Sequence, residues 1–579
     1  MYDLLPSVQK LVRRPGFFPL GKKSFASEFD PHCLVIYNKE DDVEAPGINT
    51  PDAAGGYTLE VTKKSINICA NDYAGLFYGT RTLNQLTEGF GRVPCVKITD
   101  YPDLALRAVH LDLKGNLPKF DRMKKIIENL GEYKLNAILL EYEDKFPYKK
   151  HPKIVSPLAL KPEEIEELKN VAEYNAVQII PLVQCAGHVE YILKHSKYSR
   201  LMEDRRFLNE FCLTDKRALQ VYKDLALEVL ETHKEAKYFH IGGDEAWHRG
   251  SCPACRKAAG RKGKDKFYID YVSGICDLIN QNGKTPIIWD DCFRKASPAE
   301  LKKISSKAVL MYWKYGTTTE GKEEVQYPSL QLYKKAGVRL AGASAVSGAD
   351  GMNATCVNHK RRLENNLSWA RVAKKYHMLG VAGTAWTRYC GTLPPAEAIE
   401  TAWMPVLAEA EFLWKVPAGN NFNDYSRRFV KRFYGIDSDE LVKAHYLIDK
   451  SNQKAFEARE IFKKFKSKAK KNREILGLME VSCEIIELNE HFKYVIETII
   501  ESDWYRNRHY VLWKQEKKDK LLELAEAKKI ITGIKRRALE VYSKFLKKAE
   551  AEEFVLSRFA LEEKKIDEYS IFLRKTKAK

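Results

Sequence analysis

Two adjacent carboxylates, Asp244 and Glu245, are the residues of this chain best suited to acid–base chemistry. They follow the apolar run that opens Tyr238–Trp247, which is typical of a buried strand, and two glycines at which the backbone can bend. Neighbouring side chains of a continuing strand point to opposite faces, so both carboxylates serve one pocket only if the strand ends here. The alternative interpretation is a helix N-terminus at which the two acids cap free amides.

From about residue 104 the chain alternates short apolar segments with longer amphipathic ones. The expected strands are Leu106–Leu111, Asn136–Leu140, Gln178–Val183, Tyr238–Ile241, Thr285–Trp289, Ala308–Tyr312, Val338–Gly342 and Gly380–Ala385. The expected helices lie near 119–133, 161–175, 215–235, 266–282, 298–304, 325–336, 360–377 and 394–412. This pattern favours a (β/α)8 TIM barrel over an open doubly wound sheet, for which no glycine-rich phosphate loop is found.

The active site of such a barrel lies at the carboxyl ends of the strands, so the residues that follow each strand indicate its chemistry. Acids, aromatic residues and one histidine gather there: Glu141, His188, Asp244, Glu245, Trp289, Asp291, Tyr312, Trp313, Trp386 and Tyr389. A single tryptophan is usually a core residue, but aromatic faces also suit the apolar C–H faces of sugar rings. Repetition of tryptophan and carboxylate at strand ends therefore predicts a carbohydrate site.

The rest of the chain predicts two further regions. Residues 1–100 resemble a small α+β domain, with strands at Tyr57–Val61 and Ser65–Ile68 and a helix at Asp72–Leu86. Residues 101–415 hold the barrel. Residues 416–579 are predicted to be helical, with heptad-like apolar spacing from Ile475 to Ile496. This region is expected to be a scaffold or a homodimer contact.

The formal net charge is +19, and residues 421–579 hold 37 Lys and Arg against 27 Asp and Glu. Lysine-rich helix faces, including the run Lys463–Lys471, account for this excess better than a nucleic-acid site does. The sequence contains no run of about 18 apolar residues, and Met1–Leu5 does not begin a signal peptide. Unless a leader was removed, a cytoplasmic protein is therefore expected, without a membrane or nucleic-acid partner.

The 12 cysteines do not have the spacing of a disulfide framework, which predicts reduced thiols. Cys252 and Cys255 form the one close pair, and a zinc site would need a second pair or nearby histidines. Ordinary loop thiols are therefore favoured, and neither a metal nor a cofactor is expected.

With these residues assembled, residues 55–415 resemble the family-20 glycoside hydrolases, the β-N-acetylhexosaminidases, and within them the hexosaminidase D group. His240-Ile-Gly-Gly-Asp-Glu245 is similar to the catalytic signature of the family, and Ala186-Gly-His188 to its Pro-Gly-His turn. Arg107–Gly115 looks like the first barrel strand. There are two departures. Pro181-Leu-Val-Gln184 lacks the acids that usually precede the turn, and Trp386-Thr-Arg388 replaces the usual Trp-Ser-Glu.

The resemblance implies a retaining exo-β-N-acetylhexosaminidase that releases terminal N-acetylglucosamine or N-acetylgalactosamine through an oxazolinium intermediate, a substrate-assisted variant of glycoside hydrolysis. It implies that Glu245 is the acid and base, and that Asp244 orients the substrate acetamido group.

The other roles implied are binding ones. Arg107 is expected to bind ring hydroxyls, and Trp289, Trp313 and Trp386 to wall the pocket. His188 is expected to hydrogen-bond the carboxylates or to be structural; Tyr312 and Tyr389 are weaker candidates, and Glu141 and Asp291 supporting acids. A non-catalytic glycan-binding protein on a hydrolase-like barrel is the alternative, although it would usually have lost one of the two carboxylates.

Overall fold

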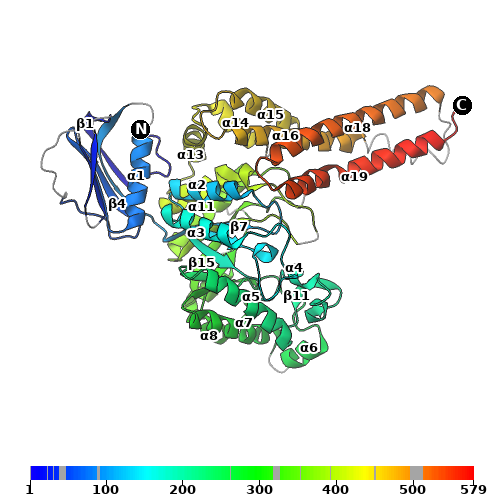
Figure 1. Ribbon diagram of the computed structural model, residues 1–579, viewed down its shortest axis with the longest axis horizontal. Coiled ribbons are helices and arrows are strands. Elements are labelled where there is room, and N and C mark those ends of the chain that lie inside the picture. The colour runs from blue at the N-terminus through cyan, green and yellow to red at the C-terminus, as the bar shows by residue number, and fades with distance from the viewer. Residues whose placement is uncertain are drawn as a thin grey trace.

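The computed structural model describes residues 2–21, 24–29, 32–37, 47–87, 91–260, 263–316, 327–351, 354–390, 393–448, 452–495 and 513–579. An N-terminal sheet lies at one side of a central barrel, and a long C-terminal helical hairpin extends from the other side (Figure 1).

Eight parallel strands close into the central barrel, as predicted. In order they are β7 (Leu106–Asp112), β8 (Ala137–Glu141), β9 (Gln178–Leu182), β12 (Tyr238–His240), β13 (Thr285–Trp289), β14 (Val309–Trp313), β15 (Arg339–Ser347) and β16 (Gly380–Ala385). The circle closes where β16 pairs with β7. Strands rich in Val, Ile, Leu and Ala suit this position because the barrel interior buries one face and the helices bury the other.

The helices around the barrel are α2 (Phe120–Glu132), α3 (Pro162–Tyr174), α5 (Lys216–Thr232), α7 (Lys264–Gln281), α8 (Pro298–Ser305), α10 (Ser329–Lys335), α11 (His359–Lys375) and α12 (Trp403–Trp414). They agree with the predicted helices except for the last, which was expected to begin at 394. Pro394 and Pro395 disfavour helix there, and a short 3-10 turn at Ile399–Ala402 precedes α12. Residues 325 and 326 of the helix predicted at 325–336 lie outside the described residues.

The N-terminal region is a six-stranded antiparallel sheet in the order β1-β6-β4-β5-β3-β2. Its strands are β1 (Lys10–Pro19), β2 (Phe25–Phe29), β3 (Cys33–Tyr37), β4 (Tyr57–Val61), β5 (Ser65–Ala70) and β6 (Arg92–Asp100). Helix α1 (Tyr73–Thr87) lies between this sheet and the barrel (Figure 1). The sequence predicted β4, β5 and α1 but missed the other four strands.

The prediction of twelve reduced thiols is wrong for one pair. Cys33 and Cys69 are joined in a disulfide, whereas the other ten cysteines are not disulfide-bonded. The two lie 36 residues apart in sequence but face each other in the register of β3 and β5. Strand register, which cysteine spacing does not reveal, brings them together.

A buried carboxylate, Asp100, joins the sheet to the barrel. It accepts hydrogen bonds from the Tyr57 hydroxyl at 2.7 Å, from Lys134 Nζ at 2.8 Å and from Trp414 Nε1 at 2.9 Å. These donors come from β4, from the turn before β8 and from the end of α12. The network therefore attaches the sheet to the barrel end at which the strands begin.

The C-terminal region contains α13 (Phe422–Phe429), α14 (Asp439–Leu447), α15 (Asn452–Lys466), α16 (Arg473–Val495), α18 (Lys514–Tyr542) and α19 (Lys548–Lys575). Helices α18 and α19 form the hairpin, and Tyr542 stacks on Phe554 at its base with ring centroids 4.4 Å apart.

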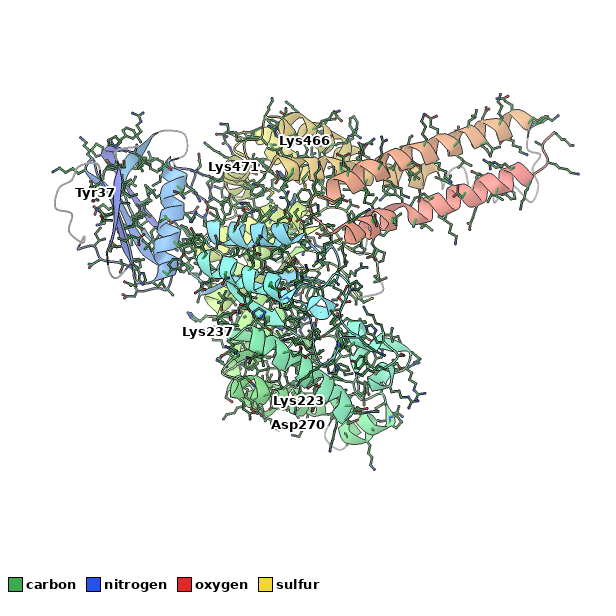
Figure 2. All side chains as sticks on the ribbon, in the orientation of Figure 1. Tyr37, Lys223, Lys237, Asp270, Lys466 and Lys471 are labelled. Atoms are coloured by element: carbon green, nitrogen blue, oxygen red, sulfur yellow. A yellow bond between two sulfur atoms is a disulfide. The ribbon has the colours of Figure 1, made fainter. Side chains whose placement is uncertain are left out.

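The apolar residues of the predicted heptad pattern are buried at Ile475, Leu478, Ile485, Leu488 and Phe492. Ile496, the last of them, lies outside the described residues. Most lysines of 463–471 are exposed, and Lys466 and Lys471 belong to the C-terminal helical region (Figure 2). None of the described helices combines the length and the apolar character needed to cross a membrane.

Replacing Glu409 tests the packing between α12 and the barrel. Glu409 is fully buried and accepts a hydrogen bond from Ser344, and burial raises its pKa from 4.5 to about 8. A raised pKa means that the folded state loses stability as pH rises through this interval. Glu409→Gln keeps a neutral hydrogen-bonding group, so we expect a higher Tm than that of the unmodified protein at pH 9 and a similar Tm at pH 5.

The pH-dependent difference in unfolding free energy should be on the order of 5 kcal/mol at most. Thermal unfolding from pH 5 to 9 measures it. The same pH dependence in both proteins would show that Glu409 does not carry this penalty.

Candidate active site

The backbone turns sharply after β12, which is only three residues long. Gly242 and Gly243 have φ values of +64° and +89°, and Glu245 has +51°. A Cβ on Gly242 would lie 1.9 Å from Gln184 Oε1, and a Cβ on Gly187 would lie 2.1 Å from the Asp244 carbonyl oxygen. Only glycine fits at these two positions, and the turn brings Asp244 and Glu245 into one cavity.

Side chains from three other strand ends hold this turn. Gln184 Oε1 accepts a hydrogen bond from Gly243 N at 3.1 Å, and its Nε2 donates to Glu141 Oε1 at 3.0 Å. Asp291 Oδ2 accepts from Glu245 N at 3.0 Å. Glu141, predicted as a supporting acid, thus acts on the turn through Gln184. Asp291, predicted in the same role, acts on the turn directly.

His188 lies between the two carboxylates. Its Nε2 is 3.4 Å from Asp244 Oδ2 and 3.3 Å from Glu245 Oε2. Burial opposes a charge on the ring, but Asp244 and Glu245 outweigh it and hold the pKa of His188 well above its ordinary 6.5. Burial alone would raise the pKa of Asp244, but His188 holds it below 3.8. An imidazolium and an ionised Asp244 therefore form a pair.

Among the described residues, no carboxylate supports His188 on its other side. Its buried Nδ1 has no hydrogen-bond partner among the described residues. No carboxylate among the described residues therefore replaces the acids that are missing from Pro181–Gln184.

A cavity of about 300 Å³ opens above the carboxylates. Among its lining residues are His188, Asp244, Glu245, Trp313, Trp386 and Tyr389, all predicted site residues. Trp313 and Trp386 wall it, and Tyr389, 63% exposed, stands at its rim. The size and the aromatic walls suit a single sugar ring.

The sequence reasoning missed several lining residues of this cavity, among them Lys114 and Tyr315. Lys114 Nζ lies 3.4 Å from Glu143 Oε1, and the charges of Asp112 and Glu143 raise its pKa well above 10.5 against the effect of burial. Tyr315 accepts a hydrogen bond from Trp386 Nε1 at 2.9 Å. Each lies two residues after the last residue of a barrel strand. This position near a strand end is the sequence signal that identifies them.

The structure corrects the expectation for Arg107. Its guanidinium donates to the carbonyl oxygens of Lys134 and Leu104, both at 2.9 Å, at the end where β7 begins. Asp112, at the other end of this strand, is five residues away, which is about 16 Å at the rise of an extended strand. Arg107 is therefore too far from the cavity to bind a sugar there.

The expectations for Tyr312 and Trp289 are also wrong. Side chains alternate along β14, so Met311 and Trp313 turn toward the barrel interior while Tyr312 packs outward against Tyr333 and Trp369. Trp289 points inward but is fully buried, with its ring centroid 4.4 Å from that of His240 and 5.9 Å from that of Trp386. It supports the cavity wall from behind.

Residues 105–417 match the family model described as the catalytic domain of glycosyl hydrolase family 20, and residues 37–101 match domain 2 of the same family. The chain belongs to glycosyl hydrolase family 20. It is a glycoside hydrolase, and the resemblance noted in its sequence is confirmed.

Two relatives are named Hexosaminidase D. The protein from Bos taurus is 30% identical over 354 residues, which cover 58% of this chain and 98% of the relative. The one from Homo sapiens is 28% identical over 324 residues, which cover 53% and 66%. Both matches cover little more than half of this chain.

Solved structures share the fold. A Flavobacterium johnsoniae chitobiase superposes with a TM-score of 0.60 at 16% identity, covering 100% of this chain and 94% of that one. A β-N-acetylhexosaminidase from Bacteroides fragilis gives 0.57 at 20% identity, covering 74% and 94%.

Arg107→Met tests the corrected position of Arg107 in this family-20 hydrolase. We expect a loss of unfolding free energy of about 2 kcal/mol, because two buried carbonyl oxygens lose their donor. The KM for an aryl glycoside substrate should change less than about twofold, whereas Trp313→Ala, which removes a cavity wall, should raise it about tenfold. Thermal unfolding and steady-state kinetics measure the two effects. A KM in Arg107→Met as high as that in Trp313→Ala would contradict this position.

Proposed function

We propose that this protein is a retaining exo-β-N-acetylhexosaminidase in which the acetamido group of the substrate is the nucleophile. It would release terminal, non-reducing N-acetylglucosamine or N-acetylgalactosamine. One observation carries the proposal: the buried Oδ1 of Asp244 has no hydrogen-bond partner among the described residues, although Asp244 lines the cavity. A buried, ionised oxygen without a donor is costly, so a donor from the substrate would satisfy it.

The acetamido N–H is such a donor. Held by Asp244, the amide would present its carbonyl oxygen to the anomeric carbon of the same sugar. The bond from that oxygen to the anomeric carbon would form as the bond to the leaving oxygen breaks. The ionised Asp244 would stabilise the positive charge that spreads into the resulting oxazolinium ring. Water would then attack the anomeric carbon from the side that the aglycone left. The bond from that carbon to the acetamido oxygen would break and restore the acetamido group, so the configuration is retained.

Glu245 is placed to exchange protons with the leaving group and with water. Its side chain is 19% exposed, against 8% for Asp244, so it is the more accessible of the two carboxylates. It would protonate the departing oxygen and then take a proton from the attacking water. Tyr389, at the rim of the same cavity, would contact the departing part of the substrate.

The remaining residues of the cavity would position the sugar. The Tyr315 hydroxyl accepts from Trp386 Nε1, so its own proton is available to the acetamido carbonyl oxygen. Burial raises the pKa of Tyr315, which keeps that proton in place. Trp313 and Trp386 would pack against the sugar and its methyl group, and the Lys114 ammonium would donate to a ring hydroxyl, the role first expected of Arg107.

The names of several relatives support this activity. One solved structure of the same fold is an exo-β-N-acetylglucosaminidase from Vibrio harveyi in complex with N-acetylglucosamine. A curated relative from Akkermansia muciniphila is named a β-hexosaminidase, at 25% identity over 289 residues.

Substitutions at the two carboxylates test the assignment of roles. Glu245→Gln should lower kcat for an aryl β-N-acetylglucosaminide by about 10³-fold or more, because proton transfer to and from the reacting oxygens is lost. Asp244→Asn should lower kcat/KM for N-acetylated substrates and, in addition, reduce the preference for them over the plain β-glucoside.

A panel of aryl N-acetylglucosaminide, N-acetylgalactosaminide and glucoside measures these changes, with Tyr312→Phe as a control outside the cavity. Unchanged hydrolysis by Glu245→Gln would overturn the role of Glu245. Binding of N-acetylglucosamine without hydrolysis by the unmodified protein would instead indicate a glycan-binding protein.

Tyr315→Phe tests the contact to the acetamido carbonyl. We expect kcat to fall by about 10²-fold while KM changes much less, because this hydrogen bond would matter most as the carbonyl oxygen becomes the nucleophile. Kinetics on the aryl N-acetylglucosaminide measure both constants. A normal kcat with a raised KM would show that Tyr315 serves only to bind the sugar.

A further inference from the structure

Three sulfur atoms and one carboxylate meet outside the catalytic cavity. The ligand atoms of Glu203, Cys212, Cys252 and Cys255 all lie within 4.8 Å of one another. We propose that these four residues form a tetrahedral binding site for Zn²⁺. The sequence predicted ordinary loop thiols because Cys252 and Cys255 had no second pair of ligands nearby in the chain. The fold supplies the missing ligands from residues 40 or more positions away.

The distances between the sulfur atoms fit a zinc ion. Cys212 Sγ lies 3.6 Å from Cys252 Sγ and 3.5 Å from Cys255 Sγ. Zinc–sulfur bonds of about 2.3 Å at tetrahedral angles place two sulfurs about 3.8 Å apart. Cys255 N donates to Cys252 Sγ at 3.3 Å. The two sulfur–sulfur distances from Cys212 are slightly shorter than the tetrahedral spacing, so the sulfurs need only move apart by a few tenths of an ångström around a metal ion.

Glu203 is the second, independent indication of a cation. It is 3% exposed, and its Oε1 accepts from Cys252 N at 2.9 Å. Its Oε2 is buried and has no hydrogen-bond partner in the part of the chain that the structure describes. A buried carboxylate oxygen beside three thiols is unfavourable on its own, and a divalent cation would compensate it.

The donor set favours zinc over the other common cations. Thiolates are soft ligands that Mg²⁺ and Ca²⁺ do not select, and three sulfurs with one oxygen in a tetrahedron suit Zn²⁺. Binding would release the protons of the three thiols to solvent. A disulfide is the alternative, but it would use two of the sulfurs and leave Glu203 Oε2 unsatisfied.

All four positions come from the protein, which indicates a structural site rather than a catalytic one. Glu203 lies on β10 (Met202–Asp204), which pairs with β11 (Phe207–Phe211), and Cys212 follows β11. Cys252 and Cys255 lie at the start of α6 (Pro253–Gly260). The metal would therefore attach the β10–β11 hairpin to the segment that follows the catalytic turn.

A second contact supports this attachment. Glu210 of β11 accepts from His248 N at 2.9 Å and pairs with His248 Nδ1 at 2.8 Å. The segment from Glu245 to Cys252 is thus held to the β10–β11 hairpin at two places. Glu210 holds the middle of the segment, and the metal cluster holds its end. We infer that zinc stabilises the loop that carries Glu245 without contacting substrate.

Metal analysis of the full-length protein tests the site. The protein is purified under reducing conditions without a metal-affinity step, supplied with Zn²⁺ and dialysed, and its zinc and free thiols are measured. We expect one zinc per chain, together with slow alkylation of Cys212, Cys252 and Cys255 that becomes fast when a chelator removes the metal. Co²⁺ in place of Zn²⁺ should give the visible and near-ultraviolet absorption of tetrahedral thiolate coordination.

Variants identify the ligands. Cys212→Ser should abolish stoichiometric zinc, and Glu203→Gln, which keeps the hydrogen bond to Cys252 N, should weaken zinc affinity by at least about tenfold. Cys95→Ser, a buried cysteine of β6 far along the chain, is the control and should keep full zinc content. Chelation should lower the Tm of the unmodified protein, and Zn²⁺ but not Mg²⁺ should restore it.

Three results would overturn the proposal, and none depends on glycosidase activity. The first is less than a tenth of an equivalent of zinc in the reduced, zinc-supplied protein. The second is a disulfide between any two of the three cysteines in protein isolated with thiols blocked at lysis. The third is unchanged zinc affinity in Glu203→Gln, which would remove the carboxylate from the site.

Discussion

The sharp turn that follows β12 is the constraint on which the active site depends. Adjacent residues such as Asp244 and Glu245 would face opposite sides of a strand, and they share one cavity only because the strand ends and the backbone enters the left-handed region at Gly242, Gly243 and Glu245. The conformation is held by hydrogen bonds to Gln184 and Asp291 from neighbouring strand ends. The barrel thus offsets the cost of the strained backbone at Glu245.

The charges around this turn balance one another at close range. His188 is held in its cationic form by two carboxylates, and Lys114 by Asp112 and Glu143. Asp291 stands apart, because burial and the nearby charges of Asp244 and Asp290 raise its pKa to about 7. Oδ1 of Asp244 lies among these paired charges without a hydrogen-bond partner among the described residues, which suits a ligand that brings a hydrogen-bond donor.

The N-terminal sheet and helix α19 contact opposite ends of the barrel. The N-terminal sheet is attached through Asp100 at the end where the strands begin, far from the cavity. Helix α19 instead reaches the loop after β16, where Arg558 donates to the Pro395 carbonyl oxygen and Glu553 pairs with Arg388. Because Arg388 lines the cavity, the C-terminal hairpin supports the active-site rim directly.

Local patterns in the sequence were enough to predict the eight barrel strands and the cavity residues His188, Asp244, Glu245, Trp313, Trp386 and Tyr389. Strand periodicity and glycine positions are local properties, and parallel strands bring their carboxyl ends together without further information.

Tertiary structure alone decided the rest, because it depends on strand direction, side-chain parity and distant neighbours. It placed Arg107 at the end of β7 that is far from the cavity, and it turned Tyr312 away from the barrel interior. It also buried Trp289 and paired Cys33 with Cys69. It also brought Cys212 and Glu203 to Cys252 and Cys255. Contacts between residues so far apart in the chain arise from packing, which leaves no periodic signal in a single sequence.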